Sequence, residues 1–260
     1  MPNPPSLHFH KTGSGPPILW VHGFPLDHTM WQYQYEEMTE YRSIAVDLRG
    51  FGRSPLVNDE FALSDLADDL KQLVKVELGS EPFVYAGLSM GGYIAWEFLD
   101  NPPENLAGLI LCDTRAADDQ EEMKRVRRLS ARNVLEEGPA AIVDPMLKKL
   151  FAEPTFEKLP DRVLDTRAVM LGTDRKTVAG ALNAMADRPD STARLAKITV
   201  PTLLICGELD QITKVDEMAQ MAEQIPDAKL SIISNAGHMC PLERPDVVNI
   251  MIRDFVGKVL

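Results

Sequence analysis

The chain has few cysteines, few positive charges and no long apolar runs, and each shortage excludes a class of protein. Three cysteines cannot form a complete disulfide framework, which favours a reducing compartment. The 260 residues contain 27 Lys and Arg against 39 Asp and Glu, a formal net charge of −12, and such a surface repels nucleic-acid backbones and anionic headgroups. No run reaches the roughly 18 apolar residues that span a bilayer, and the first residues do not have the pattern of a signal peptide. We therefore expect a cytoplasmic protein with no nucleic-acid or membrane partner.

Short apolar runs rich in Val, Ile and Leu alternate along the chain with longer segments of helical period. This pattern is typical of a parallel sheet covered by helices on both faces, so we predict an α/β fold. The expected strands are residues 18–21, 43–46, 83–86, 106–112, 202–206 and 230–233, with an antiparallel edge hairpin around residues 6–12. The expected helices between and after them are residues 62–78, 90–100, 215–224 and 245–258.

The stretch between residues 112 and 202 has no strand pattern and is far longer than an ordinary crossover. A helical insertion explains it, with Gly and Pro residues between the helices. The expected helices are residues 118–136, 139–151, 155–171 and 174–186. We therefore divide the chain into a core, residues 1–114 and 196–260, and a helical cap, residues 115–195.

Ser89 is the candidate nucleophile. It lies in a Gly-x-Ser-x-Gly motif, residues 87–91, between an apolar strand and a helical stretch. A sharp turn there lifts the hydroxyl clear of the fold, and the glycines remove side chains that would collide where the chain doubles back. The helix that follows directs its first amides at a developing oxyanion.

A serine nucleophile needs a histidine base and a carboxylate that orients it. His238 lies in a loop of small residues after the last apolar strand, where open α/β sheets keep their sites. Asp210 follows the strand at residues 202–206, and the chain order Ser89, Asp210, His238 is the one typical of this motif. Competing carboxylates are Asp113 and Asp47, each at the end of a strand, and Glu208; we interpret Asp47 as a residue that shapes its loop.

The oxyanion requires two backbone amides, one from the residue after the nucleophile and one from a loop beyond an earlier strand. Met90 supplies the first. Phe24 supplies the second, because the chain leaves the strand at residues 18–21 and turns at Gly23. We interpret His22 as a hydrogen-bonding residue of this turn and not as a base.

Five segments in this order resemble the α/β-hydrolase superfamily: residues 22–25, 47–54, 87–92, 207–210 and 237–238. Within it the chain is similar to the bacterial carboxylesterases and the 3-oxoadipate enol-lactonase-like branch. The resemblance implies a mostly parallel eight-stranded sheet flanked by helices, with the cap inserted after the sixth strand, and a scaffold role for residues 47–54. Haloalkane dehalogenases and epoxide hydrolases of this fold carry aspartate at the nucleophile position, so Ser89 argues against both. We expect no cofactor and no metal, because no cluster of His, Cys and Asp has ligand spacing in the sequence.

The substrate pocket should lie between the strand ends and the cap. A lactone that carries a carboxylate would need a cation there, and Arg115 is the best placed. The cap residues Arg125, Arg128 and Arg132 share a helical face with acidic partners, which favours a solvated face and hence a neutral ester. Besides Phe24, Met90 and Arg115, the expected pocket residues are Trp31, Tyr93, Met146, Phe151, Met170 and Met239.

We therefore predict a carboxylesterase-type serine hydrolase that acts on esters of small to medium acyl chain through an acyl-enzyme. One alternative is an enol-lactone hydrolase. Another is a sensor that uses the hydrolase pocket to bind a small ligand. The expected partner is a small-molecule ester or lactone, and the expected state is a monomer or a homodimer.

Overall fold

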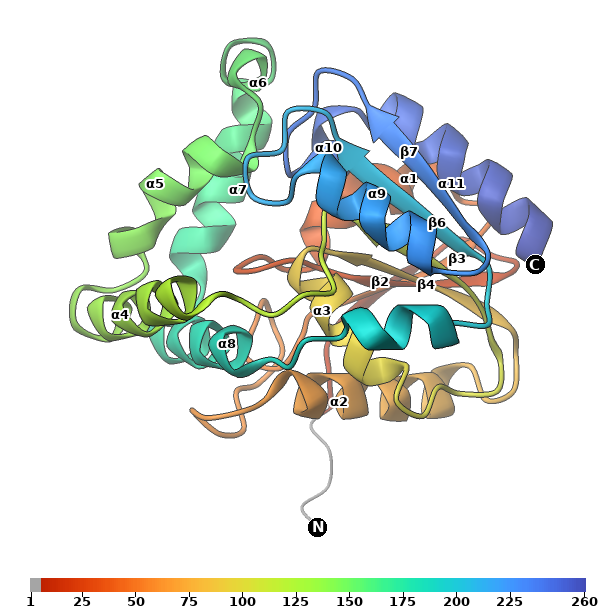
Figure 1. The fold of residues 1–260 in the computed structure, drawn as a ribbon, viewed down its shortest axis with the longest axis horizontal. Coiled ribbons are helices and arrows are strands. Elements are labelled where there is room, and N and C mark those ends of the chain that lie inside the picture. Colours follow the sequence, from red (N-terminus) through yellow and green to blue (C-terminus); the bar gives the residue numbers. More distant parts are fainter. Residues whose placement is uncertain (1–5) are drawn as a thin grey trace.

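One sheet forms the centre of the computed structural model, which describes residues 6–260 (Figure 1). Within that range it has seven strands in the order β1-β3-β2-β4-β5-β6-β7. Every neighbouring pair is parallel except β1 and β3, which are antiparallel. The strands are β1 (Phe9–Thr12), β2 (Pro17–Val21), β3 (Arg42–Val46), β4 (Phe83–Leu88), β5 (Leu106–Cys112), β6 (Thr202–Gly207) and β7 (Ala228–Ile233). This confirms the predicted α/β class.

Two details differ from the sequence prediction. The described residues form seven strands and not eight, and the helical insertion follows the fifth of them. Only seven stretches of the sequence have strand character, and the eighth strand rested on the resemblance alone. The expected edge hairpin is also different, because β1 pairs with β3 while β2 lies between β3 and β4. Residues 1–5, which the prediction placed in the core, lie outside the described residues.

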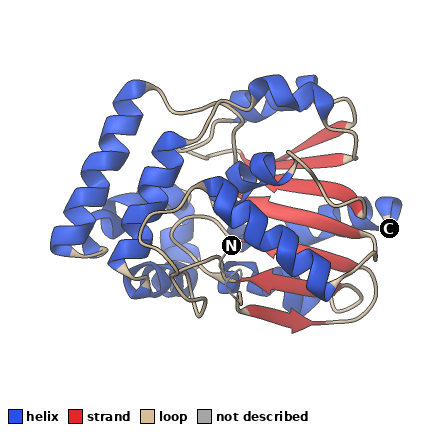
Figure 2. Cartoon of the chain, turned by 90° about the horizontal axis from the view of Figure 1, so that it is seen from below, coloured by secondary structure: helices blue, strands red, loops and turns tan. Residues whose placement is uncertain are grey.

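Helices cover both faces of the sheet (Figure 2). Successive side chains of β2 point to opposite faces of the sheet, and those on both faces are apolar. Leu19 and Val21 belong to one apolar layer, and Ile18 and Trp20 belong to the other, so both faces must be shielded from water. The first layer is closed by α2 (Leu63–Glu77), α3 (Met90–Phe98) and α9 (Val215–Gln224). The second is closed by α1 (Gln32–Glu37), α10 (Cys240–Glu243) and α11 (Pro245–Val259), with the short 3-10 turn η1 (His28–Trp31).

Five helices and a short 3-10 helix lie between β5 and β6, and the five gather at one end of the sheet in Figure 1. They are α4 (Glu121–Glu137), α5 (Ala140–Leu150), α6 (Glu153–Lys158), α7 (Pro160–Gly172) and α8 (Arg175–Asp187); the 3-10 helix η2 (Thr192–Lys197) returns the chain to the sheet. The expected helix 155–171 is two helices. Leu159, with φ of −136° and ψ of 50°, leaves the helical conformation, and Pro160, which has no N–H to donate, starts α7. The division into a core and a cap stays a prediction.

No helix among residues 6–260 is long and apolar enough to cross a bilayer.

Candidate active site

Ser89 occupies a sharp turn between β4 and α3. Its φ of 51° and ψ of −108° lie in a region that residues with side chains rarely adopt, so the surrounding chain must hold it there. Neither glycine of the motif has room for a side chain. A Cβ on Gly91 would lie 2.5 Å from the carbonyl oxygen of Val21, and a Cβ on Gly87 would lie 2.7 Å from the carbonyl carbon of Gly91. The motif glycines are therefore required by packing, as expected for a nucleophile elbow.

His238 and Asp210 form a buried hydrogen-bonded pair. The ring Nδ1 lies 2.7 Å from Asp210 Oδ2, and His238 is 2% exposed. The other oxygen, Oδ1, accepts from the backbone N–H groups of Ile212 at 2.7 Å and Thr213 at 3.0 Å. Since an ionised carboxylate only accepts, Nδ1 carries the proton and Nε2 keeps a free lone pair. This is the tautomer that a general base requires.

Ser89, Asp210 and His238 follow strands of one sheet whose inner strands are parallel, so all three lie at the carboxyl ends of these strands. The N–H of Ser89 donates to the carbonyl of Cys112 at 2.9 Å, and the hydroxyl of Thr114 donates to the carbonyl of Ser89 at 2.8 Å. Asp113, between them, has a ligand atom within 4.8 Å of both Asp210 and His238. Among the described residues the Ser89 hydroxyl has no hydrogen-bond partner.

The turn after β2 lies directly against the elbow. A Cβ on Gly23 would be 3.5 Å from the Cβ of Ser89, which places the following residue, Phe24, beside the nucleophile. His22 braces this turn: its Nδ1 donates to the carbonyl of Gly23 at 2.8 Å, and its Nε2 accepts from the N–H of Leu48 at 3.1 Å. Burial lowers the pKa of His22, which suits a neutral ring with one donor and one acceptor. These bonds agree with the interpretation of His22 as a residue of the turn.

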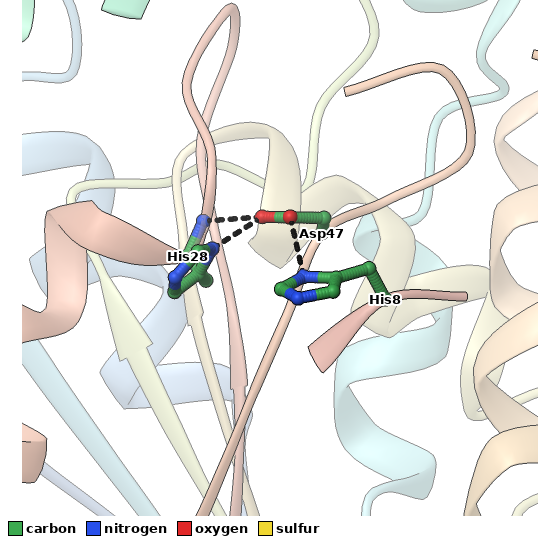
Figure 3. Close-up of side chains that lie close together, drawn as sticks. All are labelled: His8, His28 and Asp47. Carbon is green, nitrogen blue, oxygen red and sulfur yellow. Dashed lines mark hydrogen bonds and ion pairs between the residues drawn. The ribbon is translucent and has the colours of Figure 1, made fainter. Parts of the chain in front are cut away.

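Asp47 joins the loop after β3 to two histidines from other segments (Figure 3). Its Oδ1 accepts from the ring and the backbone N–H of His28 at 2.7 and 2.9 Å, and its Oδ2 accepts from the ring of His8 at 2.9 Å and the N–H of Arg53 at 3.0 Å. Burial acts to raise the pKa of Asp47, but the bonds from His28 and Arg53 hold it well below its usual range. All its acceptor positions serve the scaffold, which agrees with a loop-shaping role.

The other competing carboxylates do not bond His238 in the described part of the chain. Asp113 Oδ1 accepts from the N–H of Gly207 at 2.7 Å, and Glu208 accepts from the N–H of Asn235 at 3.1 Å. The geometry therefore brings Asp210, and neither of these, to the imidazole.

Glu243 supports the histidine loop and is a residue that sequence reasoning missed. Its Oε1 accepts from the N–H of Gly237 at 2.7 Å, and its Oε2 accepts from the N–H of Ala152 at 2.9 Å and from the hydroxyl of Thr155. Burial raises the pKa of Glu243. This carboxyl group links the loop before His238 to the start of α6. A buried Glu gives no signal in the sequence, because two of its partners, Ala152 and Thr155, lie about ninety residues away.

Two groups of side chains have the spacing of metal ligands: His8, His28 and Asp47, and Asp113, Asp210 and His238. The sequence did not reveal them because each group joins distant segments. In both, the ring Nδ1 atoms donate to the carboxylates, so hydrogen bonds already occupy these donor atoms.

A cavity of about 430 Å³ lies between the strand ends and helices α4, α5 and α8, a size that suits a small-molecule site. Four of the expected pocket residues line it: Phe24, Tyr93, Arg115 and Met146. Other apolar residues of its wall come from the inserted helices and from the Asp210 loop; they include Met123, Val126, Ile142, Leu182 and Ile212. Sequence reasoning missed these because the packing of the insertion decides which face of each helix is inward.

Four expected pocket residues do not line this cavity and belong to the apolar core. Trp31, Phe151, Met170 and Met239 are each at most 1% exposed. Trp31 packs against Trp20, with ring centroids 5.0 Å apart. Met90 is also fully buried, which leaves its backbone N–H as the part of the residue that concerns the site. All four belong to the apolar layer that also contains Ile18 and Trp20, and we reassign them to that layer.

Three cations line the cavity, and two of them, Arg115 and Arg127, are paired with carboxylates, whereas Lys149 is exposed and has no ion pair among residues 6–260. The guanidinium of Arg115 lies 3.0 Å from Glu217 Oε2 and donates to the carbonyl of Ile212. Arg127 is paired at 2.5 Å with Asp119, a cavity residue that is 4% exposed. Arg188 also pairs with Asp119, at 2.9 Å, and its guanidinium stacks 4.2 Å from the ring centroid of Tyr93.

The comparisons with known proteins agree with this architecture. Residues 16–245 match the family model of the alpha/beta hydrolase fold, and the chain belongs to this family. It is similar to the solved structure of a thermophilic esterase from Thermogutta terrifontis, with 44% identity, coverage of 97% of this chain and 93% of that chain, and a TM-score of 0.94.

It is also similar to the enol-lactonase from Burkholderia xenovorans LB400, with 25% identity, coverage of 98% of each chain and a TM-score of 0.90. Among curated proteins, the AB hydrolase superfamily protein YisY of Bacillus subtilis (strain 168) is 28% identical over 260 residues, which cover 96% of this chain and 95% of YisY. The chain is thus an α/β-hydrolase of the bacterial esterase and enol-lactonase type, as the sequence motifs predicted.

Proposed function

We propose that the protein is a serine carboxylesterase that cleaves esters of small to medium acyl chain through an acyl-enzyme. The observation that carries this proposal is the buried Asp210–His238 hydrogen bond of 2.7 Å, which leaves Nε2 free to accept a proton, and the strained turn that holds Ser89 at the same end of the sheet supports it. The similarity to a solved esterase at 44% identity supports the same reaction class.

In the acylation half-reaction, His238 Nε2 removes the proton from Ser89 as the hydroxyl oxygen attacks the acyl carbon. Asp210 stabilises the resulting imidazolium through the Nδ1 hydrogen bond. The N–H groups of Phe24 and Met90 bind the oxyanion, and each such donor typically stabilises the transition state by about 2.7–4 kcal/mol. His238 then passes its proton to the alcohol, which leaves as the carbon–oxygen bond breaks.

Deacylation repeats these steps with water. His238 takes a proton from a water molecule, the hydroxide attacks the acyl carbon, and the proton returns to Ser89 as the acid is released. These steps need no group beyond the side chains and amides named here. The three cysteines, all within the described residues, are free and buried, which supports the proposed cytoplasmic location. A monomer or a homodimer stays our expectation.

An uncharged acyl group suits the cavity best. The guanidinium groups of Arg115 and Arg127 already face carboxylates, and most other lining residues are apolar. An enol-lactone hydrolase is the second candidate, favoured by the likeness to the Burkholderia enol-lactonase at a TM-score of 0.90. A carboxylate-bearing lactone would then pair with Lys149, an exposed residue of the cavity wall, or displace Glu217 or Asp119 from its arginine.

The test is hydrolysis of p-nitrophenyl acetate, butyrate and octanoate beside an enol-lactone, by the purified protein and by Ser89→Ala. We expect turnover of the shorter esters and a loss of at least about 10⁴-fold in kcat in the variant. Ser80→Ala is the matched control and should keep full activity, because this exposed serine lies before β4, at the opposite end of the strand from Ser89. Turnover of the lactone alone would favour the second candidate, and ligand binding without turnover of any substrate would favour the sensor.

A further inference from the structure

Asp113 is a buried carboxyl group that the reaction above does not use. It follows β5 directly, is fully buried and has a φ of 46°, a backbone conformation that is unusual for a residue with a side chain. Its N–H donates to the carbonyl of Ile205 at 2.9 Å, its Oδ1 accepts from Gly207 at 2.7 Å, and its carbonyl accepts from the hydroxyl of Thr213 at 3.3 Å. Asp113 therefore ties the end of β5 to the segment that carries Asp210.

The same carboxyl group belongs to a tight cluster with the proposed acid and base. Ligand atoms of Asp113, Asp210 and His238 all lie within 4.8 Å of one another, and all three residues are buried. Asp113 Oδ2 is buried and has no hydrogen-bond partner within residues 6–260. The titratable groups that surround Asp113 are Asp210, His238 and the thiols of Cys112, Cys206 and Cys240.

Two carboxyl groups this close in a buried site do not both ionise, because the like charges repel and both lose hydration. Asp210 has three hydrogen-bond donors that favour its charged form: His238, Ile212 and Thr213. Asp113 has one backbone donor, Gly207, and otherwise only the weakly donating thiols of Cys206 and Cys240 beside it. Burial, together with the neighbouring charge of Asp210, raises the pKa of Asp113 well above its usual range. These contacts favour a single negative charge in the cluster.

We propose that Asp113 is a positioning residue of the active site that stays protonated in the working enzyme: it anchors the Asp210 segment and leaves Asp210 as the only negative charge beside His238. This inference rests on the proposed function, in which His238 is the base and Asp210 its partner. It predicts that the neutral amide of asparagine replaces Asp113 without changing the charge that His238 experiences.

The first experiment measures the pH midpoint of the His238 ring signal by NMR in the wild-type protein and in Asp113→Asn, with His238→Gln to assign the signal. We expect the midpoint to move by less than half a pH unit. Removing an ionised carboxylate within 4.8 Å would destabilise the imidazolium and lower the midpoint by at least about 2.5 units at an effective dielectric constant of about 20. A fall of half a unit or more would therefore overturn the proposal. Asp100→Asn, at an exposed position, controls for the change in net charge.

The second experiment tests the positioning role with Asp113→Ala, which removes the acceptor of the Gly207 N–H. We expect kcat to fall at least about tenfold and the NMR signal of the proton between His238 and Asp210 to weaken. In Asp113→Asn, both the loss of kcat and the weakening of this signal should be smaller. An alanine variant that keeps both rate and signal would refute the positioning role. If that variant does not fold, the asparagine variant still decides between the two charge states. The titration needs no substrate, so a failure of the proposed esterase activity would be seen separately, as absent turnover in the wild-type protein.

Discussion

Replacing Asp210 with asparagine is the most informative single change, because it keeps the shape of the side chain and alters only its charge and its donors. Asp210 Oδ1 accepts from the N–H groups of Ile212 and Thr213 at 2.7 and 3.0 Å. The amide oxygen of the variant must keep these two bonds. Its NH₂ group then occupies the place of Oδ2, 2.7 Å from Nδ1 of His238.

The expected magnitude follows from that exchange. An NH₂ group only donates, so His238 must present Nδ1 as an acceptor and carry its proton on Nε2. A ring in that tautomer cannot remove the proton of Ser89. The corresponding change in a well-studied serine protease lowers kcat by about 10⁴-fold, and we expect a similar loss here, equivalent to about 5.4 kcal/mol of barrier.

The assay is the steady-state hydrolysis of p-nitrophenyl butyrate by the wild-type protein and by Asp210→Asn, with the fold of each checked by circular dichroism. The KM should change little, because Asp210 does not line the cavity. Asp216→Asn, an exposed position on α9, removes the same charge and should keep full activity. A loss of kcat smaller than tenfold in Asp210→Asn would refute the assignment of Asp210 as the residue that orients the base.

Three further changes test the scaffold and the cavity. Burial acts to lower the pKa of His28, but the hydrogen bond to Asp47 raises this pKa overall. The charged form of His28 therefore stabilises the fold at pH values below the pKa of His28 in the unfolded chain. This contribution is lost as the pH rises through the higher pKa of His28 in the folded protein. His28→Gln should therefore lower the free energy of unfolding in urea more at pH 6 than at pH 9, and an equal loss at both would contradict the argument. Asp119→Ala leaves Arg188 buried without its acid and should cost about 3–5 kcal/mol of stability; a loss below about 1 kcal/mol in urea unfolding would show that the pair is not needed. Ile142→Trp should fill part of the cavity and lower kcat/KM for p-nitrophenyl octanoate by about tenfold more than for the acetate, whereas equal losses would place the acyl chain elsewhere.

The sequence predicted most of what local pattern controls. The seven apolar runs, the elbow at Ser89 and the positions of His238 and Asp210 at strand ends were all readable, because the turn, the strand period and the chain order are local properties. The insertion was recognised from its length, although its third expected helix divides at Pro160.

What the sequence did not predict depends on packing between distant segments. Trp31 and Met239 are close in sequence to proposed site residues but fill the core, whereas Met123 and Ile142 reach the cavity because α4 and α5 turn these faces inward. Glu243 and Asp119 act through partners that no spacing rule connects to them. The competition between Asp113 and Asp210 was also open until the hydrogen bond of His238 distinguished them.

The most direct test of the central claim is to stop a turnover reaction with acid and to measure the mass of the peptide that contains Ser89. With p-nitrophenyl butyrate as substrate, we expect this peptide to gain one butyryl group in the wild-type protein and none in Ser89→Ala. An active enzyme whose Ser89 peptide stays unmodified, together with undiminished hydrolysis by Ser89→Ala, would contradict the account.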